Sequence, residues 1–204
     1  MKSILIALLP TFAALTTAIP WTPKTPSKTS SWGPDPRSPS KNGKTCTVQA
    51  LGGKKDDTPQ ILKAFADCNH GGTVVFPEDQ NYWIATKLNP VIYDVTVDWK
   101  GTWTFSDDLT YWRNNSYPIF FQNHHAGFVI SGERIHVNGY GTGGINGNGN
   151  AWYNVEQAVT QPGRPMPFVF NNTAEVFVEH CQGFPSLVLE YYEWHQYVVR
   201  QYLL

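Results

Sequence analysis

The sequence predicts an all-β protein built as a right-handed parallel β-helix, truncated, with one N-terminal capping helix. Three observations favour this fold: a glycine-rich run, strand-like segments without helical periodicity, and a single early helix. The run is Gly141–Tyr153, GTGGINGNGNAWY, in which five glycines occupy the first nine positions. Each would cost about 1 kcal/mol in a helix interior. The run therefore indicates a backbone that turns tightly and lies close to its neighbours.

A capping helix is expected where the ordered chain begins. Thr58 is expected to cap this helix and Pro59 to take its first position. The segment Asn69–Gly72, NHGG, is typical of a helix end, and Thr73–Pro77 then predicts a short buried strand. The helix is expected to cover the open end of a stack of strands, whose backbone groups would otherwise lack partners.

Strands are expected to recur after this helix. Val91–Phe105 is rich in β-formers, and Phe121–Val129 looks like a copy of Phe170–Val178. The copies begin 49 positions apart, which suggests two coils of about 25 residues each. The amide pair in each copy suits a turn that bonds to the coils on either side. A two-sheet sandwich is the alternative, but it leaves the glycine run and the early helix unexplained.

Composition excludes some functions. The 204-residue chain is 41% hydrophobic and 15% charged, with a net charge of −1 and no basic stripe of the kind that binds nucleic acid. It contains 8 Trp, 10 Tyr and 11 Phe, which can fill a core or stack on sugars. For Trp152 and Tyr153, core packing is the favoured interpretation over sugar stacking.

Four segments are expected: a signal peptide (1–18), a Pro-rich disordered segment (19–44), β-helix coils (45–179) and a divergent tail (180–204). Lys2, the apolar stretch Ile4–Ala14 and the small residues Thr16–Ala18 are typical of a secretory signal. The apolar stretch is too short to span a bilayer, so a membrane anchor is the less favoured alternative. We expect a secreted, extracellular monomer with no membrane or nucleic-acid partner.

An exported chain can form disulfides and carry glycans. Cys46 and Cys68 flank the first structured segment and are the expected disulfide, which leaves Cys181 without a partner. Asn114 and Asn171 each begin a glycosylation sequon.

Several segments resemble one enzyme family. GGKKDDTPQILKAFADCNHGGTVVFP resembles the opening cap of pectin-acting, pectin-lyase-like β-helix proteins. YGTGGINGNGNAWYN, PFVFNNTAEVFVE and SYPIFFQNHHAGFVISG resemble the polygalacturonase-like glycoside hydrolases of family 28, especially the fungal exo-polygalacturonase and exo-rhamnogalacturonase branch. The resemblance covers Cys46 to about Glu179, and Asn146 departs from it because many members carry Asp there.

The resemblance implies inverting hydrolysis of α-1,4-linked galacturonan, by aspartates in Asn-Thr-Asp and Asp-Asp motifs supported by Gly-His-Gly and Arg-Ile-Lys. We carry over no catalytic, cofactor-binding or metal-binding residue, because no position matches these motifs in context. The pair at Asp56 belongs to the helix cap, the pair at Asp107 is expected in a solvated turn, and Arg134–His136 lies in the wrong coil. The adjacent His124 and His125 should point to opposite faces of a strand, which disfavours a metal site.

The family pattern stops after Glu179. When the reading frame is moved one base forward, codons exist that turn the tail LVLEYYEWHQYVVRQYLL into a text containing WNIMNGTNMWFDNIY, which resembles the family's next coil. We therefore expect a frameshift or misplaced splice boundary near residue 180. A genuine divergent ending is the alternative.

The expected function is an N-terminal fragment of a secreted pectin hydrolase that is catalytically incomplete by itself. Pectic polysaccharide is the expected partner, either galacturonan or rhamnogalacturonan, and no cofactor is expected. One alternative is a non-catalytic carbohydrate-binding β-helix. A polysaccharide lyase is another, but it would need calcium held by clustered carboxylates, and the sequence shows no such cluster.

Overall fold

The computed structural model describes residues 43–119, 124–155, 164–182, 188–189 and 198–199, all within the compact unit Gly33–Leu204. The expected signal peptide, nearly all of the Pro-rich segment and most of the divergent tail lie outside the described residues. In the described part, strands dominate and most of them pair in parallel.

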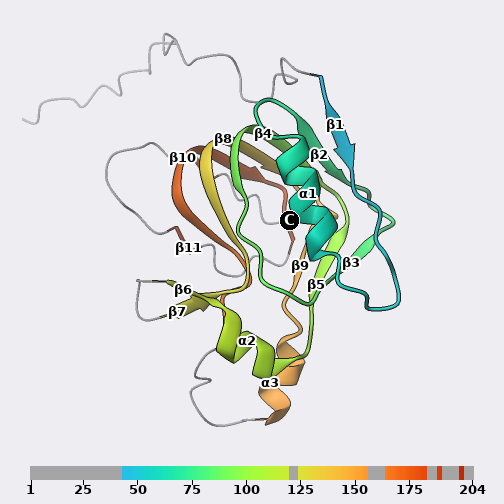
Figure 1. Ribbon diagram of the computed structural model, residues 1–204, viewed down its shortest axis with the longest axis vertical. Helices are drawn as coiled ribbons and strands as arrows, with labels where there is room; N and C mark the ends of the chain where they lie inside the picture. The colour runs from blue at the N-terminus through green and yellow to red at the C-terminus, as the bar shows by residue number, and fades with distance from the viewer. Residues whose placement is uncertain (1–42, 120–123, 156–163, 183–187, 190–197, 200–204) are drawn as a thin grey trace, which may run out of the picture. The chain divides into compact units, whose positions relative to one another are not determined.

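The largest sheet has seven strands in the order β1-β2-β4-β8-β10-β11, with β12 also pairing with β10, and every pairing in it is parallel. Successive members lie side by side (Figure 1). The strands are β1 (Thr45–Thr47), β2 (Thr73–Phe76), β4 (Val91–Trp99), β8 (Val129–Asn138), β10 (Val169–Glu179), β11 (Val188–Leu189) and β12 (Val198–Val199).

A second parallel sheet has the order β3-β5-β9, with β3 at Asn81–Ile84, β5 at Thr102–Phe105 and β9 at Gly144–Asn146. Parallel bridges extend it at both edges, from Asp56 to β3 and from Gln182 to β9. The chain alternates between the two sheets, since β2, β4 and β8 are followed by β3, β5 and β9.

The predicted repeat length is wrong. Thr73 lies opposite Thr96, 23 positions later, whereas Val129 lies opposite Val169, 40 positions later. The two internal copies proposed from the sequence pair Val129 with Val178, whereas the structure pairs it with Val169. The step between neighbouring strands varies because long segments are inserted between β5 and β8 and between β9 and β10.

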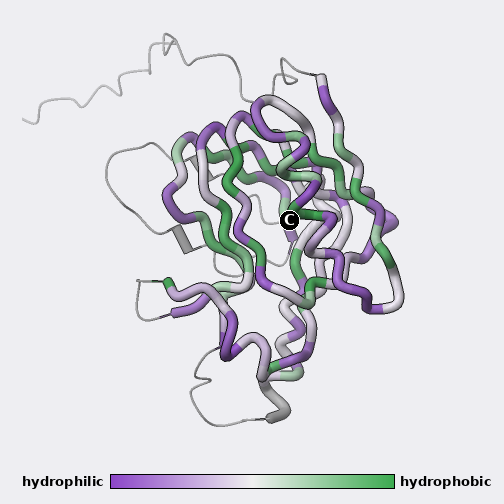
Figure 2. The backbone as a smooth tube through the Cα atoms, in the orientation of Figure 1, coloured by the Kyte–Doolittle hydropathy of each residue, from purple (hydrophilic) through white to green (hydrophobic). Residues whose placement is uncertain are grey.

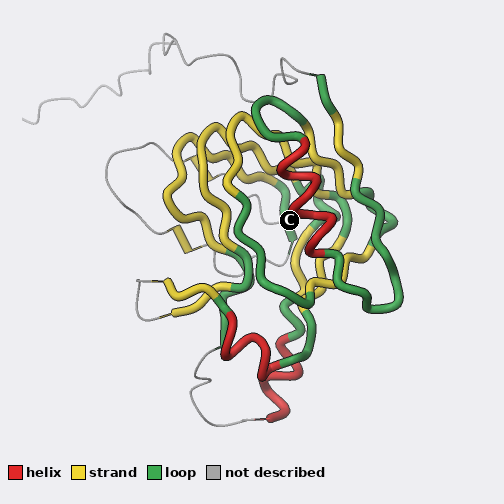
Figure 3. Tube along the Cα trace, viewed as in Figure 1, coloured by secondary structure: helices red, strands yellow, loops and turns green. Residues whose placement is uncertain are grey.

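These insertions contain two helices and a hairpin that the sequence analysis did not predict. We call them the side lobe: α2 (Leu109–Asn115), the antiparallel pair β6 (Tyr117–Ile119) and β7 (His124–Ala126), and α3 (Gly149–Val155). Figure 3 shows α2 and α3 close together beyond the strand ends, and the Arg113 guanidinium lies 5.2 Å from the centre of the Trp152 ring. Contrary to expectation, the glycine run ends in a helix, α3. The expected solvated turn at Asp107 is instead the start of α2, where Asp108 accepts a hydrogen bond from the Tyr111 amide.

The early helix, α1, spans Thr58–Asp67, one residue earlier than expected. Asp57 is the N-cap residue, so Thr58 is already helical and the predicted cap is wrong. The Asp57 carboxylate does not cap its own helix. It accepts hydrogen bonds from the backbone amides of Leu51 and Trp83 at 2.8 and 2.7 Å, and so ties the helix start to β3.

The long strands β4, β8 and β10 each bend at one residue. Asp94, Arg134 and Glu175 occupy the same register position in the three strands and have φ angles of 54°, 54° and 53°. The left-handed conformation shifts the alternation of side chains, so in β4 the buried positions change from Ile92 to Val95. One residue in each of these three strands therefore forms the corner at which the large sheet bends.

The core lies between the two sheets and is rich in aromatic rings. Trp99 and Trp103 have ring centroids 4.4 Å apart, and Phe76 lies 5.0 Å from Trp103. Phe128 and Phe168 continue the cluster, with centroids 4.6 Å apart. Figure 2 shows apolar residues along the strands and hydrophilic residues at the bends. None of the described helices has the length and apolar character needed to cross a bilayer.

Candidate functional site

The expected disulfide is present in the structure. Cys46 of β1 and Cys68 at the C-terminus of α1 are joined, with their Cα atoms 6.0 Å apart. The bond fixes the capping helix to the first strand of the large sheet. Cys181 is free, and burial raises the pKa of its thiol to about 12, so the thiol stays protonated at neutral pH.

The two sequon asparagines lie in different settings. Asn114 is exposed on the last turn of α2, although the Ser116 hydroxyl of its sequon is buried and donates to the Trp112 carbonyl. Asn171 is half-buried in β10, at an irregularity in the pairing with β8, and Thr173 of its sequon is buried. Asn114 is therefore the more accessible acceptor.

Asp56 is used internally. Its carboxylate accepts hydrogen bonds from the Thr58 and Ala85 amides and from the Thr86 hydroxyl. Burial alone would raise the pKa of Asp56, but the hydrogen bonds from Thr86, Ala85 and Thr58 lower it below its ordinary value of 3.8. With Asp57, it fastens α1 to the second sheet, so its carboxylate oxygens are already used by the fold.

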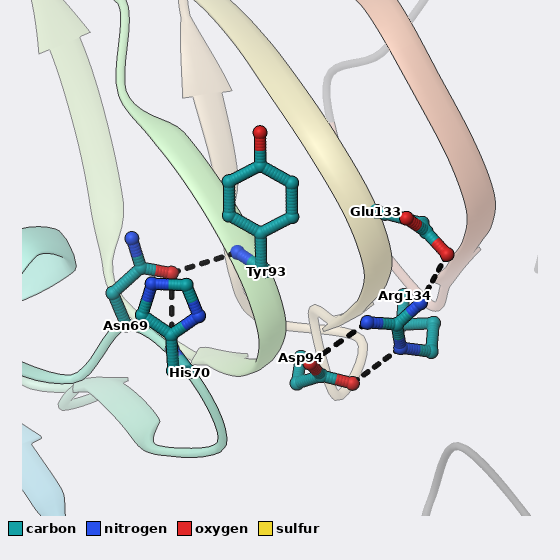
Figure 4. Close-up of polar contacts among 6 residues, drawn as sticks. All are labelled: Asn69, His70, Tyr93, Asp94, Glu133 and Arg134. Atoms are coloured by element: carbon teal, nitrogen blue, oxygen red, sulfur yellow. Dashed lines mark hydrogen bonds and ion pairs between the residues drawn. The ribbon is translucent and has the colours of Figure 1, made fainter.

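Asn69 makes contacts with β4 of the kind expected from the amide pairs near residues 122 and 171. Residues 122 and 123 lie outside the described residues. Its side-chain oxygen accepts from the Tyr93 amide at 2.7 Å (Figure 4). Its side-chain nitrogen donates to the Val91 carbonyl at 3.1 Å. The rings of His70 and Tyr93 stack beside it, with centroids 5.6 Å apart. The NHGG pattern suggested only a helix end, so the sequence carried no signal for this second role.

The bend of the stack carries alternating charges. The Arg134 guanidinium donates to both carboxylate oxygens of Asp94 and also pairs with Glu133 (Figure 4). The hydrogen bond to Asp94 raises the pKa of Arg134. Glu175 follows at the same register position in β10. Exposed pairs of this kind contribute little stability, and they favour alignment of neighbouring strands.

A second polar cluster lies at the ends of β4, β8 and β10. His136 is buried, and its Nε2 lies 2.9 Å from Oε1 of Glu179, which also accepts from Asn138. The Tyr140 hydroxyl donates to Asp98, and burial together with this bond raises the pKa of Tyr140 to about 12. Because these groups bond to one another, Arg134–His136 is explained by strand pairing and needs no catalytic role.

The outer face of the second sheet offers the more open arrangement. Trp83, Thr104 and Asn146 form one row across β3, β5 and β9, and none of them is buried. The Lys54 ammonium lies 4.7 Å from the centre of the Trp83 ring. A cation, an aromatic ring, a hydroxyl and an amide therefore share this exposed face. Sequence reasoning missed this face because register alone brings these residues together.

The remaining candidates do not form a site. Trp152 is only 4% exposed and belongs to the core, as expected, while the Tyr153 side chain lies outside the described residues. His124 is exposed and His125 is partly exposed in the hairpin strand β7. No three His, Cys, Asp or Glu side chains converge as metal ligands within the described part of the chain.

Two parallel sheets with an aromatic core between them define the fold, and a solved structure shares it. The endo-xylogalacturonan hydrolase of Aspergillus tubingensis superimposes with a TM-score of 0.53 at 23% identity, over 67% of this chain and 36% of that one. No family model matches the chain.

Sequence comparison finds relatives that match part of this chain. It is 66% identical over 138 residues to an Aspergillus niger protein named "Putative galacturan 1,4-alpha-galacturonidase C", a match covering 68% of this chain and 33% of that protein. It is 43% identical over 118 residues to an exopolygalacturonase of Cochliobolus carbonum, covering 57% and 26%. The chain is a part-length homologue of the fungal exopolygalacturonases and galacturonidases of glycoside hydrolase family 28. It spans about a third or less of these relatives.

Proposed function

We propose that this chain forms the first coils of a secreted pectin hydrolase that cleaves α-1,4-galacturonan from the chain end with inversion. In this proposal the two sheets are faces of a right-handed parallel β-helix that α1 caps. The identity of 66% over 138 residues to a protein named for galacturonidase activity carries the proposal. The shared fold of a xylogalacturonan hydrolase supports it.

Inverting hydrolysis requires one carboxylic acid to protonate the leaving oxygen and another carboxylate to activate water, roughly 6.5–9.5 Å away. The described carboxylates of Asp56, Asp57, Asp94 and Glu179 are each held by hydrogen bonds or ion pairs to neighbouring strands and loops. We propose that the catalytic aspartates of this lineage belong to coils that follow those described here.

The first experiment assays the 204-residue chain on polygalacturonate. We expect no release of galacturonic acid above a blank. Release clearly above the blank would show that carboxylates of this chain suffice for catalysis.

The second experiment tests the proposed change of frame. We propose that the segment 180–204 departs from the family through a frameshift or splice boundary, which sequencing of the gene across residues 175–204 decides. If Leu189 is not encoded by CTG or TTG, or Glu190 not by GAA, the proposal fails. A frame-restored protein should release galacturonic acid from chain ends, first as the β-anomer.

Secretion, processing after residue 18, a monomeric state and glycosylation complete the proposal. The disulfide and the exposed Asn114 support an extracellular location. Treatment of secreted protein with a glycan-removing amidase should lower its apparent mass, and Asn114→Gln should abolish most of that shift.

A further inference from the structure

We propose that Asn146 is a site of spontaneous deamidation, at which the Gly147 amide nitrogen attacks the Asn146 side chain and water completes the conversion to aspartate and isoaspartate. Asparagine is a thermolabile residue, and attack by the following backbone amide is least hindered when that residue is glycine, which has no Cβ atom. The sequence contains four Asn-Gly pairs, and those that begin at Asn138, Asn146 and Asn148 lie within the described residues. The structure distinguishes these three pairs.

The reaction balances with water as the co-reactant. The Gly147 nitrogen forms a bond to Cγ of Asn146, the Cγ–Nδ2 bond breaks, and the amide proton leaves with the departing nitrogen as ammonia. Water then opens the cyclic imide at either carbonyl carbon, which leaves aspartate or isoaspartate. No group is oxidised or reduced, and the mass rises by about 1 Da because OH replaces NH2.

Asn146 and Gly147 are both exposed, at the point where β9 ends. The Gly147 amide donates to no described residue, and a Cβ atom on Gly147 would meet nothing within 4 Å. A Cβ atom on Gly143 or Gly144 would instead clash with neighbouring backbone. The chain is therefore held just before the reacting residue and has room just after it, which allows the nitrogen to reach the side chain.

The Asn146 side chain is held in one orientation. Its Oδ1 accepts the Asn148 backbone amide at 3.0 Å, so Nδ2 is the other end of the amide group. Negative charge develops on this oxygen when Cγ is attacked, and a backbone donor stabilises such charge. Nδ2 donates to no described residue, so ammonia can leave without breaking a contact with the described part of the chain.

Asn138 makes the same local contact but precedes a constrained glycine. Its Oδ1 accepts the Tyr140 amide at 2.8 Å, which is the contact that Asn146 makes two residues ahead. The Gly139 nitrogen, however, donates to the Glu179 carbonyl at 2.9 Å, and Nδ2 of Asn138 donates to the Glu179 carboxylate at 3.2 Å. The attacking and departing nitrogens are both engaged there, so deamidation requires the sheet to open locally.

Asn148 is the intermediate case. It precedes Gly149, the first residue of α3, and its carbonyl accepts the Ala151 amide at 3.1 Å. Its side chain is half-buried. Because the start of the helix fixes the backbone around this pair, we expect slower reaction here than at Asn146.

Conversion changes the edge of the second sheet next to α3. Aspartate adds a negative charge in the row that contains Thr104, whereas isoaspartate adds one carbon to the main chain between β9 and α3. In isoaspartate the former side chain becomes main chain, so the Asn148 amide loses its acceptor. Since Trp152 of α3 belongs to the core, the isoaspartate form should have a less firmly held helix.

The test incubates the purified full chain in mildly alkaline buffer and follows each pair by peptide mapping under mildly acidic conditions with fragment-ion mass spectrometry. We expect position 146 to convert at least about tenfold faster than position 138, whose reaction first requires loss of hydrogen bonds. A methyltransferase specific for isoaspartate should label the peptide that contains position 146. In urea the two positions should react at similar rates, because the fold no longer protects Asn138.

Gly147→Ala is the matched variant, because it places a methyl group where the structure has room for it. The methyl group hinders the attack, so conversion of Asn146 should slow about tenfold or more, while the rate at Asn138 stays unchanged. Thermal unfolding checks that the variant is folded like the wild type. Equal rates at positions 138 and 146 in the folded chain would overturn the inference, as would no conversion at 146, faster conversion at 148, or an unchanged rate in Gly147→Ala.

Discussion

Individual glycines of the run at 141–149 have different roles in the structure. A Cβ atom on Gly143 would lie 1.5 Å from the Trp99 carbonyl oxygen, and one on Gly144 would lie 2.0 Å from that of Gln182. Gly147, by contrast, has nothing within 4 Å of a Cβ position. Close approach of neighbouring backbones therefore requires glycine at part of the run only.

The first prediction compares two glycines. Gly143→Ala should lower the free energy of unfolding by about 2–4 kcal/mol, because the backbone of β4 must move to admit a methyl group. Gly147→Ala should change it by less than about 0.5 kcal/mol. Urea denaturation followed by tryptophan fluorescence measures both. Similar values for the two variants would contradict the close contact.

The second prediction concerns Asp56 and pH. Its pKa is lowered in the folded state, so its contribution is present above pH 3.8 and is lost as pH falls through the folded pKa. Stability of the wild type should therefore fall as the pH is lowered from 3.8 through the folded pKa of Asp56. The fall should be shallower in Asp56→Asn, measured as unfolding free energy at each pH. Parallel curves for the two proteins would show that Asp56 does not contribute.

At the scale of elements, the helix α2 of the side lobe depends on one capping hydrogen bond and one buried side chain. α2 has only seven residues, and its start is fixed by one hydrogen bond from Tyr111 to Asp108. Its buried Trp112 packs on Phe105, with ring centroids 5.3 Å apart. A helix this short is marginal without such contacts.

The third prediction therefore removes the cap. Asp108→Ala should destabilise the protein by about 1 kcal/mol, since the Tyr111 amide loses its acceptor. Asp107→Ala, at the exposed neighbouring position, is the control and should have little effect. Thermal unfolding of the two variants gives the comparison, and an equal loss in both would argue against the cap.

The parallel strands, the early helix and the Cys46–Cys68 pair could be predicted from sequence because each leaves a local pattern. The pairing register could not. The insertions that carry α2 and α3 lengthen the step between strands, and no periodicity in the sequence records their size. The row on the outer face of the second sheet was missed for a related reason: Lys54, Trp83 and Thr104 become neighbours only in the folded chain.

At the scale of the whole molecule, each strand of the large sheet contacts mainly its immediate neighbours. Stability in such a stack is close to a sum of terms between adjacent layers. The disulfide lies at one end of the order, on β1 and α1.

The fourth prediction follows from this arrangement. Replacing Cys46 and Cys68 together by Ala opens a cross-link between residues 22 positions apart, which should cost about 3 kcal/mol. Amide hydrogen exchange should accelerate most in β1, α1 and β2 and progressively less toward β8 and β10. Uniform acceleration across the sheet would instead indicate one cooperative unit.

The single-residue corner at Asp94, Arg134 and Glu175 restricts how this architecture can grow. A lengthened corner in one strand would shift the pleat of that strand against both neighbours, so insertions there disrupt the stack. The opposite junctions, after β5 and after β9, already hold a helix each. New surface can accordingly be grafted at those junctions without disturbing the sheets, which makes them the places to engineer a loop.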